Sequence, residues 1–250
     1  ISKANGKQRP LGIPTLRDRI VQRAMLMVME PIWENDFYSL SYGFRPERSV
    51  HHAIRTVKLQ LTGSNVPKGR WVIEGDLSSY FDTVHHQLLM KCVRKRISCQ
   101  RFNKLLWQFI KAGHIERNLF CATSEGVPQG GVISPMLSNI MLNEFDQYLD
   151  KCYLGKKARK DRWYWNRTVQ DKRNIALEEN RQYKPAVAYC RYADDFLVMV
   201  KGNKLQAEAI RDQCRNFLEG NLKLTLNMEK THITHVNDGF IFLGHRIIRK

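Results

Sequence analysis

Two adjacent aspartates stand between two apolar segments of this chain, in the stretch AYCRYADDFLVMV at residues 188–200. The flanking residues are aromatic and aliphatic, as in strands, whereas adjacent carboxylates repel each other and weaken strand propensity. If the flanks pair as antiparallel strands, Ala193, Asp194 and Asp195 occupy the tight turn between them. Folding does not require this pair, which suggests that the turn presents carboxylates for metal binding.

A third carboxylate follows another apolar segment. Asp76 stands near the end of the expected strand WVIEGDL at residues 71–77, and it would meet the aspartate pair if the two strands lie side by side. A cluster of like charges is stable only with a cation among them, and hard oxygen ligands favour Mg²⁺. Two such ions are the usual device for nucleotidyl transfer. The alternative is a pair of solvated turn aspartates, because Asp is a common turn residue.

Apolar periodicity predicts the elements that position these residues. The helical pattern at residues 17–33 is expected to stop at Pro31. Ser49 is expected to cap the next helix, and Asp82 is expected to cap the helix at residues 83–96. The mixture of helices and strands, with hairpins towards the end, indicates an α+β fold. Further expected elements are helices at 49–61, 102–113, 135–153 and 204–219, strands at 71–77 and 222–226, and hairpins at 186–200 and 239–248.

The charge balance points to a polyanionic partner. The chain has 41 Lys and Arg against 24 Asp and Glu, a net charge of +17, so nucleic acid is the leading candidate. An anionic membrane is the weaker alternative, because no basic helix with a clean apolar face stands out and no apolar run is long enough to span a bilayer. The six cysteines form no CxxC pair, which favours free thiols.

A basic segment with aromatic residues interrupts the core at residues 156–184, and it is expected to be an insertion or a surface arm. Its Trp163, Tyr164 and Trp165 could stack on RNA bases or pack the arm onto the body, and the sequence leaves both interpretations open.

The order of the motifs resembles that of the reverse transcriptases encoded by group II introns. YADDF resembles the metal-binding turn of reverse transcriptases, and GDLSSYFDTVHH resembles the palm strand with the first catalytic aspartate. The form of QGGVISP is closer to the intron enzymes than to the retroviral ones. The other matching blocks are GKQRPLGIPTLRDRIVQ, SYGFRPERSVHHAI, GVPQGGVISPMLSNIMLNEFD, LTLNMEKTHI and FIFLGH.

The resemblance implies a role for individual residues. Asp76, Asp194 and Asp195 match the metal-binding triad, and the Leu77 carbonyl matches a further ligand of two Mg²⁺ ions, for which Mn²⁺ could substitute. Lys230 matches the lysine that protonates leaving pyrophosphate; a surface lysine is the alternative. The expected catalytic residues are therefore Asp76, Asp194, Asp195 and Lys230.

The nucleotide site and the primer grip are also implied by the resemblance. The Phe81 ring would exclude a ribose 2′-hydroxyl, with an ordinary core phenylalanine as the alternative. Backbone amides of residues 78–81 suit a triphosphate at a strand-to-helix corner. The expected nucleotide-binding residues are Lys3, Lys7, Arg9, Ser78, Ser79, Tyr80, Phe81, Gln129 and Gly130, and the expected primer-grip residues are Phe242, Leu243 and Gly244.

The resemblance implies a right-hand polymerase of α+β class, with fingers and an antiparallel palm sheet backed by helices, but without a thumb. The expected division is fingers at 1–70, palm at 71–92, fingers at 93–133 and palm at 134–250. The abrupt first and last residues suggest part of a longer protein. The implied function is that of a maturase: RNA-directed DNA polymerase activity and binding of intron RNA during splicing.

The implied partners are an RNA template and primer duplex, intron RNA, deoxynucleotides and, in a full-length protein, a DNA target site. No membrane partner is expected, and a homodimer is left open. The expected location is the bacterial cytoplasm, in an intron ribonucleoprotein, with an organelle as the alternative. Two other functions stay open: a reverse transcriptase of another bacterial class (immunity-associated, retron or diversity-generating), and a non-catalytic RNA-binding splicing factor.

Overall fold

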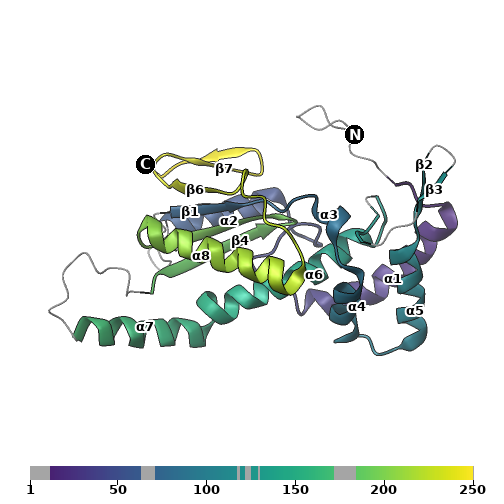
Figure 1. Ribbon diagram of the computed structural model, residues 1–250, viewed down its shortest axis with the longest axis horizontal. Coiled ribbons are helices and arrows are strands. Elements are labelled where there is room, and N and C mark those ends of the chain that lie inside the picture. Colours follow the sequence, from purple (N-terminus) through teal and green to yellow (C-terminus); the bar gives the residue numbers. More distant parts are fainter. Residues whose placement is uncertain are drawn as a thin grey trace. The chain divides into compact units, whose positions relative to one another are not determined.

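The computed structural model describes residues 12–62, 71–116, 119–121, 125–128, 130–171 and 184–249. The chain divides into two compact units (Figure 1). The first, here called the sheet unit, comprises Tyr38–Leu77, Glu144–Asn221 and Thr225–Lys250. The second, the helical unit, comprises Ile1–Phe37, Ser78–Asn143 and Leu222–Leu224.

The sheet unit is built on four antiparallel strands. Their order is β4-β5-β1-β6, and each neighbouring pair is antiparallel. A separate two-stranded hairpin, β7 and β8, packs with one face of this sheet. The strands are β1 (Trp71–Gly75), β4 (Ala186–Tyr192), β5 (Asp195–Lys201), β6 (His232–His235), β7 (Phe240–Phe242) and β8 (His245–Ile247).

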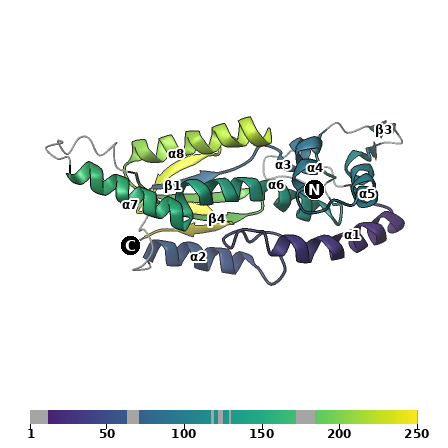
Figure 2. The ribbon, with the colours of Figure 1, turned by 90° about the horizontal axis from the view of Figure 1, so that it is seen from below.

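Both faces of the sheet are covered, because alternate residues of its strands are apolar on both sides. Helix α2 (Val50–Thr62) and the β7–β8 hairpin cover one face, where they bury residues such as Val72, Leu197 and Met199. Helix α8 (Lys204–Phe217) and the end of α6 (Ser134–Leu149) cover the other face, where Phe145 packs edge-on against Phe196. Figure 2 shows α8 and α2 on opposite sides of the strands.

The outer edge of β4 is also covered, which removes a free strand edge from solvent. The buried Gln60 side chain donates to the Tyr189 carbonyl at 3.0 Å. The backbone of Arg191 pairs with the loop that precedes α2. Its amide donates to Leu40 O at 3.0 Å, and its carbonyl accepts from Tyr42 N at 2.9 Å.

The helical unit holds short elements around the first half of α6. The Tyr80 hydroxyl donates to the Ser138 carbonyl of α6 at 2.8 Å, and the His86 imidazole bonds the Gly126 carbonyl at 2.6 Å. These bonds join the segment after β1 to α6 and to the loop before it. The elements are α1 (Leu16–Glu34), α3 (Tyr80–Thr83), α4 (His86–Arg94), α5 (Gln100–Lys111), β2 (His114–Glu116) and β3 (Leu119–Cys121).

Helix α6 continues into the basic segment. A π-helical stretch η1 (Asp150–Leu154) follows it, and α7 (Lys156–Asp171) comes next; a second π-helical stretch, η3 (Leu218–Leu222), follows α8. Within the ranges that the structure describes, no helix is both long and apolar enough to cross a membrane.

A buried ion pair joins α6 to the sheet. Arg191 on β4 donates to both carboxylate oxygens of Asp146, from Nε at 2.8 Å and from Nη2 at 2.6 Å, and both side chains are fully buried. The Tyr189 hydroxyl donates to Asp146 at 2.6 Å, and Arg191 Nη1 donates to the Ala193 carbonyl at 2.8 Å. The pair therefore ties α6, β4 and the aspartate turn together.

The α+β class and the antiparallel sheet backed by helices are confirmed, as are the Ser49 cap, which accepts from His52 N at 3.3 Å, and the two hairpins. The expected stop at Pro31 is wrong. Helix α1 runs through Pro31 to Glu34, because the proline lies in the last turn and the Asn35 side chain donates to its carbonyl at 2.9 Å.

Two further local predictions are wrong. Asp82 lies inside the short helix α3, and the cap of α4 is His85, whose Nδ1 accepts from Leu88 N at 3.4 Å. Residues 222–226 form only an isolated bridge, Leu77 to Leu226, and the strand that pairs with β1 lies later, at β6. In the two compact units, α2 packs with the sheet and residues 78–143 cluster with α1; the expected division into fingers and palm stays a prediction.

The buried ion pair predicts a large loss of stability on mutation. Asp146→Ala should lower the free energy of unfolding by about 3–5 kcal/mol, because the Arg191 charge would be left buried without its partner. Urea unfolding followed by circular dichroism measures this. In the partly exposed pair Arg211–Asp212, the control Asp212→Ala should cost less than about 1 kcal/mol. Equal losses in the two variants would contradict a special role for the buried pair.

Candidate active site

The register of β1 and β5 brings two of the predicted aspartates together. Gly75 pairs with Phe196, so Asp76 directly follows the end of β1 where Asp195 begins β5. A β-carbon on Gly75 would lie 2.1 Å from the Phe196 ring, so this position requires glycine. The predicted adjacency of the two strands is therefore observed, and their carboxylates enter one site.

The turn between β4 and β5 is short and strained. It consists of Ala193 and Asp194, with Ala193 at a φ of 54°, a region that disfavours residues with a β-carbon. Arg191 donates to the Ala193 carbonyl, and Gly43 lies so close that its β-carbon would be 2.3 Å from Ala193 N. The turn is thus held from both sides, which fixes the position of the two aspartates.

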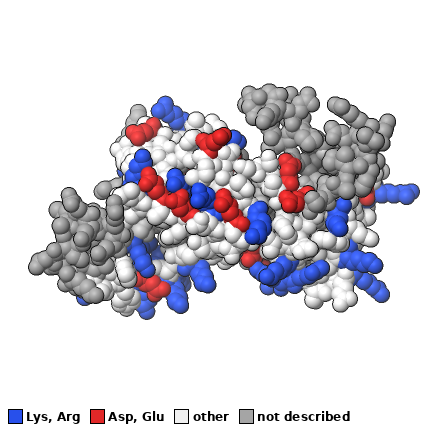
Figure 3. Space-filling view, in the orientation of Figure 1, with Lys and Arg blue, Asp and Glu red and all other residues white. Residues whose placement is uncertain are grey.

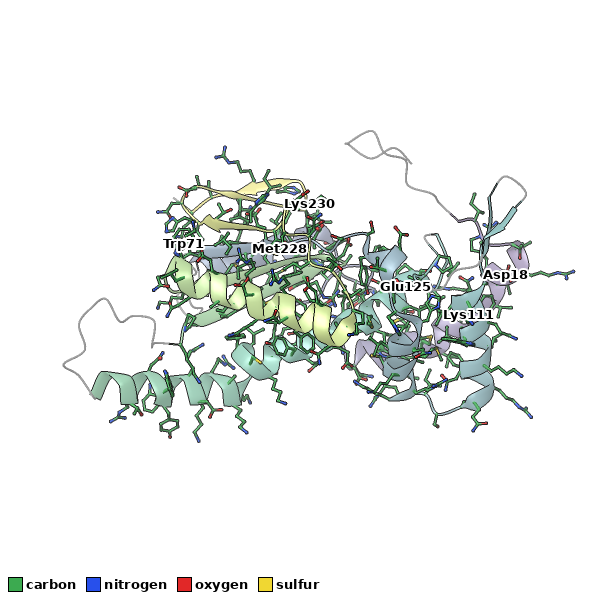
Figure 4. All side chains as sticks on the ribbon, viewed as in Figure 1. Asp18, Trp71, Lys111, Glu125, Met228 and Lys230 are labelled. Atoms are coloured by element: carbon green, nitrogen blue, oxygen red, sulfur yellow. The ribbon has the colours of Figure 1, made fainter. Side chains whose placement is uncertain are left out.

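A cavity of about 300 Å³ lies at this corner of the sheet unit, and Asp76 and Asp195 line it. Lys230, which is labelled in Figure 4, also lines it, and its Nζ lies 3.2 Å from Asp76 Oδ2. Asn227 N donates to the Asp76 carbonyl at 2.9 Å, and Asn227 O accepts from Lys230 N at 3.2 Å. The turn that carries Lys230 is therefore anchored on Asp76 itself.

The β7–β8 hairpin forms another wall of the cavity. Its turn residues Leu243 and Gly244 have φ values of 50° and 77°, as in a two-residue hairpin turn with both central residues left-handed. Phe242 is buried in the core of the sheet unit and anchors the hairpin. The three predicted primer-grip residues thus line the same cavity as Asp76 and Asp195.

Glu74, which is not among the predicted site residues, connects the hairpin to β1. It lies two residues before Asp76 on β1; its Oε1 accepts from the Thr234 hydroxyl at 2.7 Å and its Oε2 from Ile241 N at 3.2 Å. One carboxylate therefore joins β1, β6 and β7. The signal available in the sequence was an acidic residue within an otherwise apolar strand, and Arg191 carries the same signal on β4.

The site is electrostatically unfavourable without a cation. Burial, together with the negative charges of Asp194 and Asp76, raises the pKa of Asp195 from 3.8 to about 6, while the positive charge of Lys230 opposes the shift. The two neighbouring carboxylates therefore disfavour the ionised form of Asp195, although Asp195 itself is exposed at the cavity.

The donor chemistry of this corner suits a hard divalent cation, because carboxylate oxygens converge and repel one another there. Within the described ranges, however, no three acidic, histidine or cysteine side chains are grouped closely enough to hold a metal ion. Lys230 stands against Asp76 and offsets its charge. The residues fit Mg²⁺ by type, and its binding remains a proposal.

Some of the predicted nucleotide-binding residues lie in the helical unit. Val127 N donates to the Phe81 carbonyl at 2.7 Å, which holds the residue 78–81 segment against the loop that leads to Gly130. Ser79 has a φ of 46°, and Tyr80 is buried with its hydroxyl bonded to α6. The Phe81 ring is half-buried and packs edge-on against Tyr80 at 5.5 Å. Lys3, Lys7, Arg9 and Gln129 lie outside the described residues.

Comparison with known families decides the identity of the chain. Residues 1–247 match the family described as reverse transcriptase (RNA-dependent DNA polymerase). The chain belongs to the reverse transcriptase family. The resemblance on which the sequence analysis relied is confirmed, since its relatives include proteins encoded by group II introns.

Protein YkfC of Escherichia coli (strain K12) is 76% identical over 250 residues, which is 100% of this chain and 66% of YkfC. The group II intron-encoded protein LtrA of Lactococcus lactis subsp. cremoris is 36% identical over 282 residues, covering 99% of this chain and 46% of LtrA. The reverse transcriptase chain thus spans two thirds or less of the length of these relatives.

Solved structures of telomerase share the fold. Apo telomerase from Candida tropicalis, truncated from the C-terminal domain, gives a TM-score of 0.58 at 15% identity and covers 92% of this chain and 44% of that one. Telomerase from Candida albicans in complex with a TWJ fragment of telomeric RNA gives 0.55 at 13% identity, over 92% of this chain and 36% of that one. At these identities the likeness concerns the fold alone.

The raised pKa of Asp195 predicts a pH-dependent gain in stability on mutation. The ionised carboxylate is disfavoured in the folded state, so Asp195→Asn should raise the melting temperature in EDTA above about pH 6. The gain should shrink as the pH falls from about 6 towards 4, because the folded wild-type protein then binds the proton.

Thermal unfolding from about pH 8 to about pH 4.5 tests this sign. Asp238→Asn, at an exposed loop position, is the control and should show no such trend. A gain from Asp195→Asn that stays constant with pH would assign the effect to packing of the amide instead of to charge.

Proposed function

We propose that this reverse transcriptase chain is an RNA-directed DNA polymerase, of the kind that copies intron RNA into DNA. The observation that carries the proposal is the shared cavity of the sheet unit. Asp76 and Asp195, which come from adjacent strands, line it together with Lys230 and the tip of the β7–β8 hairpin. Family membership supports the reaction class, and the intron-encoded relatives support an intron origin.

In the proposed reaction the primer 3′-hydroxyl attacks the α-phosphorus of a deoxynucleotide. A new P–O bond forms, the bond to the β-phosphate breaks, and pyrophosphate leaves. Asp76, Asp194 and Asp195, with the Leu77 carbonyl, would hold Mg²⁺. The chemistry that bound Mg²⁺ supplies is activation of the hydroxyl and neutralisation of the leaving group.

The chain's own groups would position the substrates and move one proton. Lys230, whose ammonium contacts Asp76, would donate a proton to the departing pyrophosphate. Leu243 and Gly244 would support the primer end from the hairpin tip, which Glu74 braces through Ile241 N. Phe81, five positions after Asp76, would exclude a 2′-hydroxyl.

Intron RNA, a template–primer duplex and deoxynucleotides are the proposed partners, together with a DNA target site for a full-length protein. The net charge of +17 favours a nucleic acid partner. Assistance to splicing and a cytoplasmic ribonucleoprotein belong to the same proposal, which rests on the similarity to the intron-encoded relatives.

Primer extension on an RNA template tests the reaction. With Mg²⁺ and deoxynucleotides, Asp194→Ala should lower extension by at least about a hundredfold, since loss of a metal ligand removes several kcal/mol of transition-state stabilisation. The chain should be assayed alone and extended by the C-terminal region of an intron-encoded relative. Glu229→Ala, on an exposed turn beside Lys230, is the matched acidic control. Undiminished extension by Asp194→Ala would remove the metal assignment, and RNA binding without extension by any form would favour a non-catalytic splicing factor.

The sugar preference gives a second test. Phe81→Ala should lower the ratio of kcat/KM for deoxynucleotides over ribonucleotides by about tenfold or more, because the ring that would exclude the 2′-hydroxyl is gone. Phe102→Ala, at a half-buried phenylalanine on α5, is the control. An unchanged ratio in Phe81→Ala would make Phe81 a packing residue only.

A further inference from the structure

Helix α7 presents a basic and aromatic surface that the catalytic cavity does not use. Residues 156–168 include six Lys and Arg and one acidic residue, Asp161. Of the described elements, only η1 is in extensive contact with α7, and Ala158 is the one buried residue of α7 among residues 156–168. In Figure 3 the charged side chains at the lower left, where Figure 1 places α7, are mainly Lys and Arg.

The exposed residues follow the spacing of one helical face. Lys156, Lys160, Trp163 and Arg167 are separated by four, three and four residues, so they form a continuous stripe, and all four are exposed. Tyr164 lies beside this stripe. Trp163 and Tyr164 are 54% and 53% exposed, so about half of each residue is accessible to a ligand.

The cations of α7 lie over its aromatic rings. Arg167 Cζ is 5.3 Å from the centre of the Trp163 ring, and Lys160 Nζ is 5.8 Å from that of Tyr164. The two rings contact each other edge to face at 4.9 Å. Each ring therefore has a cationic side chain over one face, at the place where a flat group such as a base would stack.

We propose that the stripe Lys156, Lys160, Trp163 and Arg167, together with Tyr164, binds an unpaired segment of RNA. Bases stack on the Trp163 and Tyr164 rings, and the displaced Lys160 and Arg167 side chains turn to the neighbouring phosphates. Aromatic platforms beside cations are the usual means of binding single strands, because every base offers a flat face and every nucleotide a charge. The inference rests on the proposed function in one respect, that the ligand of the chain is RNA.

The composition of the surface favours RNA over a membrane. A helix that lies on a bilayer needs an aliphatic face opposite its charges, and α7 exposes no Leu, Ile, Val or Met among residues 156–168. An unpaired strand is favoured over a duplex, because the rings can stack only on bases that are not paired inside a helix.

Equilibrium binding of a fluorescent oligouridylate of about 12 nucleotides, against an RNA hairpin of equal length, tests the proposal. The double variant Trp163→Ala with Tyr164→Ala should lose about tenfold or more in affinity for the single strand and much less for the hairpin. The double variant Trp163→Phe with Tyr164→Phe keeps an aromatic ring at both positions and should retain most of the single-strand affinity. Lys160→Gln with Arg167→Gln should flatten the dependence of affinity on salt, by about 0.7 in logarithmic slope for each lost phosphate contact.

Matched controls separate this surface from general effects. Leu59→Ala removes an exposed apolar side chain from α2, and Lys58→Gln with Lys201→Gln removes two exposed charges elsewhere in the sheet unit. Single-strand affinity that falls no further in the alanine pair than in Leu59→Ala would overturn the proposal. So would vesicles of phosphatidylserine that bind the wild-type chain but not the alanine pair, with RNA binding unchanged.

The same protein preparations separate this proposal from the proposed function. Asp194→Ala should bind the oligouridylate as the wild type does, so a polymerase that fails to extend leaves the α7 result intact. Conversely, normal extension with no effect of the alanine pair on binding would remove only the α7 surface.

Discussion

The fully buried pair of Arg191 and Asp146 is the interaction on which the position of the aspartate turn depends. Taking two charges out of water is expensive, and a bidentate geometry with further hydrogen bonds offsets that cost. The Tyr189 hydroxyl donates a further hydrogen bond to the Asp146 carboxylate, and Arg191 Nη1 donates to Ala193 O. An apolar pair of equal volume could pack α6 on the sheet, but it would leave the turn carbonyl without this donor. The ion pair therefore links the packing of a helix to the placement of Asp194.

The carboxylates at the aspartate turn carry an electrostatic cost. Asp195 lies close enough to Asp194 and Asp76 for its pKa to rise, and folding gains nothing from such repulsion. Three features hold the carboxylates in place nevertheless. Lys230 contacts Asp76, the close approach of Gly43 restricts the turn, and Gly75 allows the Phe196 ring to lie over β1. Glu74 then uses the same strand to fix the hairpin, so one short strand organises both walls of the cavity.

Local signals predicted much of the secondary structure and failed where a neighbour in space decided the outcome. Periodicity predicted α1, and Ser49 was recognised as a cap. The expected stop at Pro31 is wrong because the proline removes one helical hydrogen bond, only three residues of α1 follow it, and the Asn35 side chain satisfies its carbonyl. Residues 222–226 alternate like a strand, yet the edge of β1 is taken by β6. Strand propensity does not predict which segment pairs with β1, because the pairing depends on how segments distant in the sequence are placed in the fold.

The amino-acid sequence by itself determined the family, the aspartate turn, and the expectation that Asp76 would join it. These follow from residue types at short spacings, which local chemistry constrains. Only the tertiary structure decided that Arg191 meets Asp146, 45 positions away, that Glu74 accepts from Thr234 and Ile241, and that the rings of Trp163 and Tyr164 face outward. A charged residue in an apolar strand indicates that the fold must supply a compensating partner. Which partner it finds is decided by packing between distant segments, because desolvated charges are stable only where the whole fold brings their complement within hydrogen-bonding distance.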